Sequence, residues 1–372
     1  MRIGIDGREL VKDKITGIGR FLLNFLCSDL SIKEDWQFVI FLNQDSKFDK
    51  EEPHFKKIVI PENITFLWDQ IKLCRWLAKE NIDLFFSPYY KVPLLTRSKT
   101  VITLFDITYL MISPYKDKLS NRLYIRNFLK HAIRKADKII TSSNYSLTEI
   151  SSKLNVPKEK ISIVPICVGD SFKPVSDETV LKQIKEKYRI KNKYILYIGN
   201  FSPHKNLKRL IDAYNLLPEG IKKEYHLLLG GGESKELELD NSQSNISALQ
   251  SIRILGHTSD EDLPALYSGA ELFIFPSLYE GFGLPPLEAM ACGCAVASSN
   301  TSSMPEVLGD ASFFFNPNDI HEISRAIEQM LEDENLRNEL RQKGLARAEH
   351  FSSKKMVTKL LDVFESVIGI RP

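Results

Sequence analysis

The chain has 372 residues, of which 43% are hydrophobic and 26% charged, which is ordinary for a globular protein and predicts two domains at this length. No run of 18 apolar residues occurs, which excludes a membrane-spanning helix, and five cysteines without regular spacing argue against a disulfide framework. The net charge of +2 divides unevenly, with +7 over residues 1–170 and −5 over the remainder, as two domains with different partners would show.

The first half alternates predicted strands and helices. Its N-terminus, MRIGIDGREL, carries charges where a signal peptide needs an apolar run, so we expect a first strand and a cytoplasmic protein. Short runs rich in Ile, Val and Phe are typical of buried parallel strands. They cover residues 2–7, 36–42, 83–88, 100–106, 138–143 and 161–166, with helical patterns at 17–30 and 121–136.

The alternation breaks at the polar, proline-containing segment 169–178 and then restarts. Strands are predicted at 194–199, 225–232, 252–257, 272–277 and 294–299, and helices at 206–217, 260–270, 285–293 and 352–369. This order predicts an α/β protein with two Rossmann-like, doubly wound parallel-sheet domains that face a central cleft. We expect the domains to cover residues 1–170 and 171–351, with the C-terminal helix, 352–372, packed back on the first domain.

One loop of the second half combines two acids, two glycines and two prolines in the sequence LYEGFGLPPLE. The helix predicted from Pro285 exposes backbone N–H groups at its start, which favour an anion, and Gly281 and Gly283 let a phosphate approach closely. Glu288, one turn into the helix, can accept both hydroxyls of a ribose, while Glu280 can reach hydroxyls beyond the phosphate. The spacing suits a ribose–diphosphate–sugar, although a capped surface loop with two solvated acids fits it equally well.

The segment EGFGLPPLE has the E-x7-E pattern of retaining glycosyltransferases of family four, which have the GT-B fold. Residues 263–317 and 197–214 are similar to that family, as is GIGRFLLNFL near the N-terminus. The resemblance is to mannosyltransferases among others. It implies metal-independent transfer of a hexose, with GDP-mannose or a UDP-sugar as the donor and a saccharide or lipid-linked saccharide as the acceptor.

The resemblance also implies roles for individual residues. Glu280 would contact the transferred sugar, and Lys205 would neutralise the leaving diphosphate. Glu288 would hold the donor ribose. The other expected donor-binding positions are the loop residues Gly281, Phe282, Gly283 and Leu284, the base-binding residues Gly256, His257 and Thr258, and Gly17, Gly19 and Asn200.

The sequence departs from the family pattern at two places. Asn200 and His204 stand where the family often has an arginine before the lysine, so Arg20 is a candidate to replace that charge. Phe105 and Asp106 stand where similar sequences read His-Asp. Asp106 is therefore interpreted either as a catalytic group that assists deprotonation of the acceptor hydroxyl or as a strand-end cap.

We expect no metal and no cofactor. The acidic triplet at residues 260–262 is interpreted as a helix-capping pattern rather than a metal-binding D-x-D. Residues 115–138 hold eight Lys or Arg against two Asp, with Arg122, Arg126, Lys130 and Arg134 on one helical face. This face predicts peripheral attachment to an anionic membrane, and a solvated helix face is the alternative. No nucleic-acid-binding motif is present.

Two other functions remain compatible with the sequence. A nucleotide-sugar epimerase of the same fold would use the same donor loop without an acceptor. A non-catalytic sugar-binding subunit would explain the departures at Phe105 and Asn200. The sequence leaves the sugar, the base, the acceptor and the oligomeric state open.

Overall fold

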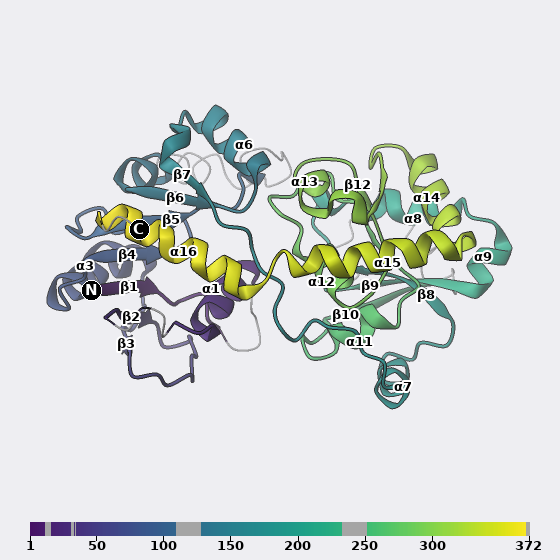
Figure 1. Ribbon diagram of the computed structural model, residues 1–372, viewed down its shortest axis with the longest axis horizontal. Helices are drawn as coiled ribbons and strands as arrows, with labels where there is room; N and C mark the ends of the chain where they lie inside the picture. The colour runs from purple at the N-terminus through teal and green to yellow at the C-terminus, as the bar shows by residue number, and fades with distance from the viewer. Residues whose placement is uncertain (12–15, 31–32, 34, 109–127, 233–250, 370–372) are drawn as a thin grey trace. The chain divides into compact units, whose positions relative to one another are not determined.

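A computed structural model of the chain describes all residues except 12–15, 31–32, 34, 109–127, 233–250 and 370–372 (Figure 1). The chain forms two compact units. The first consists of Met1–Cys167 together with Ser353–Pro372, and the second is Val168–Ser352. The C-terminal helix thus belongs to the same unit as the N-terminal strand.

The first unit is built on a seven-stranded parallel sheet with the order β3-β2-β1-β4-β5-β6-β7. The strands are β1 (Arg2–Asp6), β2 (Gln37–Leu42), β3 (Phe55–Val59), β4 (Leu84–Ser87), β5 (Lys99–Thr103), β6 (Lys138–Thr141) and β7 (Ile161–Ile163). The order runs outward in both directions from β1 and β4. A doubly wound sheet binds its ligand beyond the carboxyl ends of the strands where the order reverses, which here lies between β1 and β4.

Helices cover both faces of this sheet. Helix α1 (Gly17–Cys27) packs against α16 (Ser353–Ile368) (Figure 1). The rings of Phe25 and Phe364 meet edge to face at 6.1 Å. The opposite face buries Val39 and Phe41 of β2 against Trp68, Leu73 and Leu77. These come from a continuous helical segment made of α2 (Thr65–Leu67), a π-helical turn (Trp68–Lys72) and α3 (Leu73–Lys79), while α6 (Asn144–Leu154) lies further along the chain.

The second unit is built on a six-stranded parallel sheet with the order β10-β9-β8-β11-β12-β13. Its strands are β8 (Lys193–Ile198), β9 (Tyr225–Gly230), β10 (Ile252–Gly256), β11 (Leu272–Phe275), β12 (Val296–Ser299) and β13 (Phe313–Phe315). Its helices are α7 (Glu178–Lys187), α8 (Leu207–Asn215), α9 (Glu219–Glu224), α11 (Leu263–Ser268), α12 (Leu284–Ala291), α13 (Met304–Leu308), α14 (Ile320–Glu332) and α15 (Glu334–Glu349). The order reverses between β8 and β11.

The predicted α/β class with two doubly wound parallel sheets is confirmed. Two strands were missed by the sequence analysis, β3 and β13, and each lies at the edge of its sheet. Among the residues that the structure describes, no helix combines the length and the apolar content needed to cross a bilayer.

Candidate active site

The residues that follow β8 and β11 meet at the carboxyl edge of the second sheet. Lys205 lies in the turn after β8, Glu280 lies in the loop after β11, and the Lys205 ammonium contacts a Glu280 carboxylate oxygen at 2.6 Å. Both side chains are largely buried, with exposed fractions of 12% and 13%. Seventy-five residues separate them in sequence, so the reversal of strand order between β8 and β11 brings them together.

Asn206 holds the lysine loop in place. Its backbone is left-handed, with φ of 62°, and its buried amide nitrogen donates to the carbonyl oxygens of Pro276 at 3.1 Å and Pro317 at 2.7 Å. Arg209 donates to the amide oxygen of the same residue at 2.9 Å. One asparagine thus ties the loop after β8 to the segments that follow β11 and β13, and it fixes the position of Lys205 beside it.

Two serines hold the backbone of Glu280. The Glu280 N–H donates to the Ser302 hydroxyl at 3.0 Å, and the Ser303 hydroxyl donates to the Glu280 carbonyl oxygen at 3.0 Å. Sequence patterns do not reveal Asn206, Ser302 or Ser303, because each acts through a backbone contact that only the fold creates. An asparagine directly after the lysine is the one local signal, because asparagine adopts the left-handed conformation more readily than most residues.

The glycine loop leads directly into α12. Gly283 precedes the helix with φ of 89°, and a Cβ atom placed there would lie 2.2 Å from the Met304 methyl carbon. The helix begins at Leu284, one residue before the predicted start, with prolines in its first turn. Gly281 and Phe282 are buried, and the Phe282 ring packs edge-on against Phe351 at 5.5 Å. The backbone of this loop, rather than the Phe282 side chain, is therefore the part that can contact a ligand.

Glu288 lies one turn into α12 and is only 1% exposed. Its carboxylate accepts a hydrogen bond from the Tyr267 hydroxyl of α11 at 3.1 Å. Neither Glu280 nor Glu288 is a solvated acid, so the alternative of an ordinary surface loop does not describe this segment. Tyr267 was not selected from the sequence, where an aromatic residue in a helical pattern reads as core.

The remaining predicted donor residues of this unit lie at the ends of β8 and β10. Asn200 is exposed, and its side-chain oxygen accepts from the Ser202 N–H at 3.3 Å. Gly256 ends β10 with φ of 74°, and its carbonyl oxygen accepts from the Gly231 N–H at 2.8 Å. His257 is exposed and Thr258 is buried. All of them follow strands of one sheet, at the edge where Lys205 and Glu280 lie.

Comparison with known proteins decides the family. Residues 181–347 match the family model described as Glycosyl transferases group 1, and residues 28–171 match that of Glycosyltransferase Family 4. The O-antigen chain mannosyltransferase B of Escherichia coli is 32% identical to this chain over 375 residues, which cover 96% of this chain and 98% of that protein. The chain belongs to glycosyltransferase family 4. The resemblance predicted from the loop and the expected glycosyltransferase class are confirmed, and the non-catalytic alternative falls away.

Solved structures support the fold of this family 4 glycosyltransferase. A sucrose-phosphate synthase from Thermosynechococcus elongatus superposes with a TM-score of 0.77 at 18% identity, over the full length of both chains. Anabaena Alr3699/HepE, solved in complex with UDP-glucose, gives 0.76 at 19% identity, covering 98% of this chain and all of that one. At these identities the likeness shows the fold, which is GT-B.

Three predicted site residues lie in the first unit of the enzyme. Asp106 follows β5, and its carboxylate accepts from the Thr108 N–H at 2.9 Å, as a strand-end cap does. Phe105 packs edge to face on Phe21 at 5.0 Å. Gly17 and Gly19 open α1, where the Thr16 hydroxyl accepts from the Gly19 N–H at 3.1 Å. A Cβ on Gly17 would meet no atom of the described residues within 4 Å.

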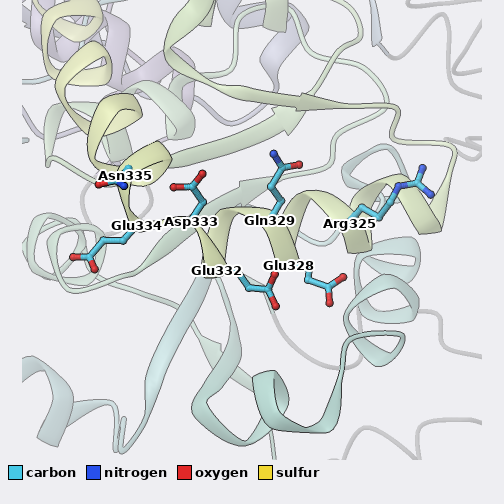
Figure 2. A pocket seen from close by; sticks show the side chains of 7 residues that line it. All are labelled: Arg325, Glu328, Gln329, Glu332, Asp333, Glu334 and Asn335. Atoms are coloured by element: carbon cyan, nitrogen blue, oxygen red, sulfur yellow. The ribbon is translucent and has the colours of Figure 1, made fainter.

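Other polar clusters have different roles. Asp262, of the acidic triplet, accepts hydrogen bonds from the Lys187 ammonium at 2.6 Å and the Tyr188 hydroxyl at 2.7 Å. A hollow of about 590 Å³ lies along α14 and the start of α15 (Figure 2). Figure 2 shows its acidic side chains spread along the helices instead of converging, and Asp333 caps α15 by accepting from Leu336 N–H at 2.9 Å. This hollow is a solvated helix face.

Proposed function

We propose that this glycosyltransferase transfers a hexose, with retention of configuration and without a metal ion, from a nucleotide-diphosphate sugar to a hydroxyl of a glycan or lipid-linked saccharide. GDP-mannose is the first donor to test, because a full-length relative is a mannosyltransferase of O-antigen chains, and a UDP-sugar is the second, because HepE was solved with UDP-glucose. The observation that carries the proposal is the buried Lys205–Glu280 pair beside the start of α12.

The chemistry of transfer requires a site that stabilises a leaving diphosphate. Negative charge builds on that group as the glycosidic bond breaks, and a fixed cation and aligned N–H groups stabilise it. We assign Lys205 and the backbone N–H groups of Gly281 to Leu284 to this role. Glu280, which neutralises the lysine in the free enzyme, would accept hydrogen bonds from the hydroxyls of the transferred sugar.

Retention follows from the family resemblance. The attacking hydroxyl would approach on the face that the diphosphate leaves, and the leaving phosphate would take its proton. Asp106 would assist through the carboxylate oxygen that does not cap the Thr108 N–H. Glu288 would hold the ribose hydroxyls, with its carboxylate oriented by Tyr267.

Two substitutions separate the proposed roles. Glu280→Gln should abolish most turnover while nucleotide binding is kept, because the amide frees Lys205 and removes only contacts to the sugar. Glu288→Ala should instead weaken nucleotide binding, and Tyr267→Phe is its matched control because it removes the same hydrogen bond and leaves the carboxylate. Transfer assays and calorimetry measure the two effects, and an active Glu280→Gln enzyme would refute the assignment.

The donor and the reaction class need separate tests. A thermal-shift screen of GDP-, UDP-, ADP- and CMP-sugars identifies the donor, since a bound ligand raises the melting temperature. Incubation with donor alone tests epimerisation, because an isomerised donor without any acceptor would replace transfer as the function. Loss of activity in EDTA would contradict the metal-independent mechanism.

We also propose that the first unit attaches to the cytoplasmic face of a membrane that carries anionic lipids. Large apolar side chains are exposed on the helical segment over residues 64–72 and beside it, with exposed fractions of 57% for Ile64, 55% for Phe66, 42% for Ile71 and 82% for Leu95. Gln70 links the helical segment to the chain before Leu95, because its side chain forms hydrogen bonds with the backbone of Val92 and Leu94.

The charges around this apolar surface support an anionic partner. The acids of the segment point inward, since Glu62 and Asp69 contact Arg8, and Glu80 contacts Lys56 at 2.6 Å. Arg75 and Lys79 of α3 are exposed. Of the basic face predicted within residues 115–138, Lys130 and Arg134 are exposed, whereas Arg122 and Arg126 lie outside the described residues. Exposed apolar groups with basic neighbours favour anionic lipid.

Vesicle co-sedimentation tests this attachment. The enzyme should bind phosphatidylglycerol vesicles more strongly than phosphatidylcholine vesicles, and Phe66→Ser with Ile71→Ser should reduce the binding. Equal binding to both vesicle types would count against the proposal. Nucleic acid is not expected to compete.

A further inference from the structure

A second polar pocket lies at the carboxyl edge of the sheet in the first unit. It encloses about 180 Å³ and is lined by residues at the ends of three strands: Asp6 and Arg8 at β1, Asn43 after β2, and Tyr89 and Lys91 after β4. We call it the Arg8 pocket. The sheet order reverses between β1 and β4, which is where open parallel sheets bind small molecules.

The polar groups of the Arg8 pocket are held in place by one another. The Arg8 guanidinium donates to both Asp6 carboxylate oxygens, at 3.0 and 2.7 Å, and to Asp69 at 2.6 Å. Its planar group lies 3.7 Å from the centre of the Trp68 ring. The Asn43 amide donates to Glu62 at 2.9 Å. A ligand that bound here would order few side chains, so it would lose little binding free energy to conformational entropy.

Negative charge exceeds positive charge in this pocket. Three carboxylates line it, those of Asp6, Glu9 and Glu62. Arg8 contacts Asp6 at 2.7 Å and Glu62 at 3.4 Å, and it also contacts Asp69, outside the lining, at 2.6 Å. Lys91 is the second cation on the wall, and in the described part of the chain it forms no ion pair, although it lies 5.8 Å from the Tyr89 ring centre. An anionic ligand would be repelled by the excess carboxylates, whereas hydroxyl groups can donate to them.

We propose that the Arg8 pocket binds one neutral sugar ring of the acceptor, an inference that deepens the proposed function and rests on it. The carboxylates at the pocket accept hydrogen bonds from ring hydroxyls, and the Lys91 ammonium donates to a hydroxyl oxygen. Tyr89 supplies an aromatic wall for the apolar face of the ring. The volume admits a single ring, so the pocket selects the residue at one end of a glycan.

A purely structural role explains only part of this arrangement. Arg8 and the carboxylates that it contacts, those of Asp6, Glu62 and Asp69, form the Arg8 cluster. Buried ion pairs contribute little net stability relative to apolar packing, so this cluster is poorly explained by stability alone. Lys91 lines the same cavity and forms no ion pair in the described part of the chain, although its charge favours the ionised forms of Glu62 and Asp69. Replacing Lys91 therefore tests the ligand role without removing a partner of the Arg8 ion pairs.

The test is binding of methyl glycosides to the full-length enzyme, measured by saturation-transfer NMR titration. The probes are the methyl α-glycosides of mannose, glucose, galactose and N-acetylglucosamine, with mannose 6-phosphate as the anionic comparison. At least one glycoside should bind the wild type. Lys91→Ala should raise its Kd about tenfold, as the loss of one charge-assisted hydrogen bond predicts. Tyr89→Ala should weaken binding as well.

Lys158→Ala is the matched control, because Lys158 is an exposed lysine of the same unit and lies outside the pocket. It should leave the Kd unchanged. The proposal is overturned if no glycoside binds the wild type, if Lys91→Ala binds as the wild type does, or if mannose 6-phosphate binds more tightly than the mannoside.

Hydrolysis of the nucleotide sugar in the absence of acceptor separates this inference from the function on which it rests. Wild-type hydrolysis depends on the donor residues of the second unit, so it reports on the proposed function without relying on the Arg8 pocket. A wild type that neither hydrolyses the donor nor transfers its sugar would overturn the proposed function, while the glycoside titration would still decide the Arg8 pocket.

Discussion

The two sheets of this enzyme have the same winding but different carboxyl edges. The second sheet presents mainly backbone at its edge, with left-handed glycines at Gly256 and Gly283 and one lysine paired with one carboxylate. The first sheet presents side chains, with one arginine among three carboxylates. N–H groups with a lysine suit a diphosphate, and carboxylates suit hydroxyls. The shared topology thus offers two candidate ligand positions, and we propose that the local residues determine the chemistry of each.

The largest expected effect comes from removing the lysine of the second edge. Lys205→Ala should lower kcat/KM by about 10²- to 10³-fold, because the leaving diphosphate loses its fixed cation and faces an unpaired Glu280. Lys191→Ala, at an exposed lysine of the same unit, should leave kcat/KM unchanged. Steady-state transfer kinetics measure both variants.

The double variant sharpens this result. Because Lys205 and Glu280 are in contact, the effects of Lys205→Ala and Glu280→Gln should be far from additive, with the double variant close to the worse single one. If the two losses in kcat/KM multiply in the double variant, Lys205 and Glu280 act independently. That result would contradict the description of the second edge as a functional lysine–carboxylate pair.

Gly283→Ala tests the backbone character of the second edge. Gly283 has a left-handed backbone, which alanine adopts only with strain, and the added Cβ would lie 2.2 Å from the Met304 methyl carbon. We therefore expect the free energy of unfolding to fall by about 1–3 kcal/mol. Nucleotide binding should weaken as well. Gly220→Ala is the matched control, because that helical glycine has open space around it and should gain about 0.5–1 kcal/mol. Urea unfolding measures both, and a neutral Gly283→Ala would contradict the argument.

The sequence predicted the central strands of both sheets and missed one edge strand in each. The central strands are buried on both faces and read as continuous apolar runs. Strand β3, with the sequence FKKIV, carries two lysines because it lies at an edge, and β13 has only three residues. An edge strand can be short or carry charges, so composition predicted the edge strands β7 and β10 but not β3 and β13.

The residues of the candidate site also fall into two groups, those that the sequence predicts and those that it does not. Lys205, Glu280 and Glu288 were predicted because each combines a reactive side chain with a strand end or helix start. Asn206, Ser302 and Tyr267 were missed because their bonds reach residues 21 to 111 positions away. Asp6 lies near the end of the first predicted strand and Arg8 directly follows that strand, but the carboxylates of Glu62 and Asp69 join them only after the chain has folded.

The acid excess of the first edge predicts a pH effect. Burial raises the pKa of Asp69 from 3.8 to about 6 despite the opposing influence of Arg8, and Asp6 adds repulsion. A carboxyl group with a raised folded-state pKa binds a proton on folding, so its contribution to stability is full below pH 4 and is lost as pH rises through about 6. Neighbouring Glu62, hydrogen-bonded by Asn43, has a lowered pKa despite its own burial and acts in the opposite direction.

The Asp69→Asn variant isolates this contribution. Between pH 4 and 6 the free energy of unfolding of the wild type, relative to the variant, should fall with rising pH by up to about 3 kcal/mol. Denaturant titrations of both proteins across this range measure the difference. A difference that does not change with pH would mean that Asp69 is ionised throughout, and the Arg8 cluster would be a simple set of ion pairs.

The smallest expected effect concerns Asp106, which was interpreted either as a catalytic group or as a strand-end cap. One carboxylate oxygen caps the Thr108 N–H at 2.9 Å, and we propose that the other accepts from an acceptor hydroxyl. Asp106→Asn keeps an oxygen for the cap but loses the charge, so the free energy of unfolding should stay unchanged while transfer slows by about tenfold. The effect is smaller than for a full general base, because in the proposed mechanism the leaving phosphate accepts the proton. Asp106→Ala should also cost about 1 kcal/mol in stability. If Asp106→Asn transfers sugar at the wild-type rate, Asp106 is a cap alone, and the first edge contributes to acceptor binding without contributing to the chemistry.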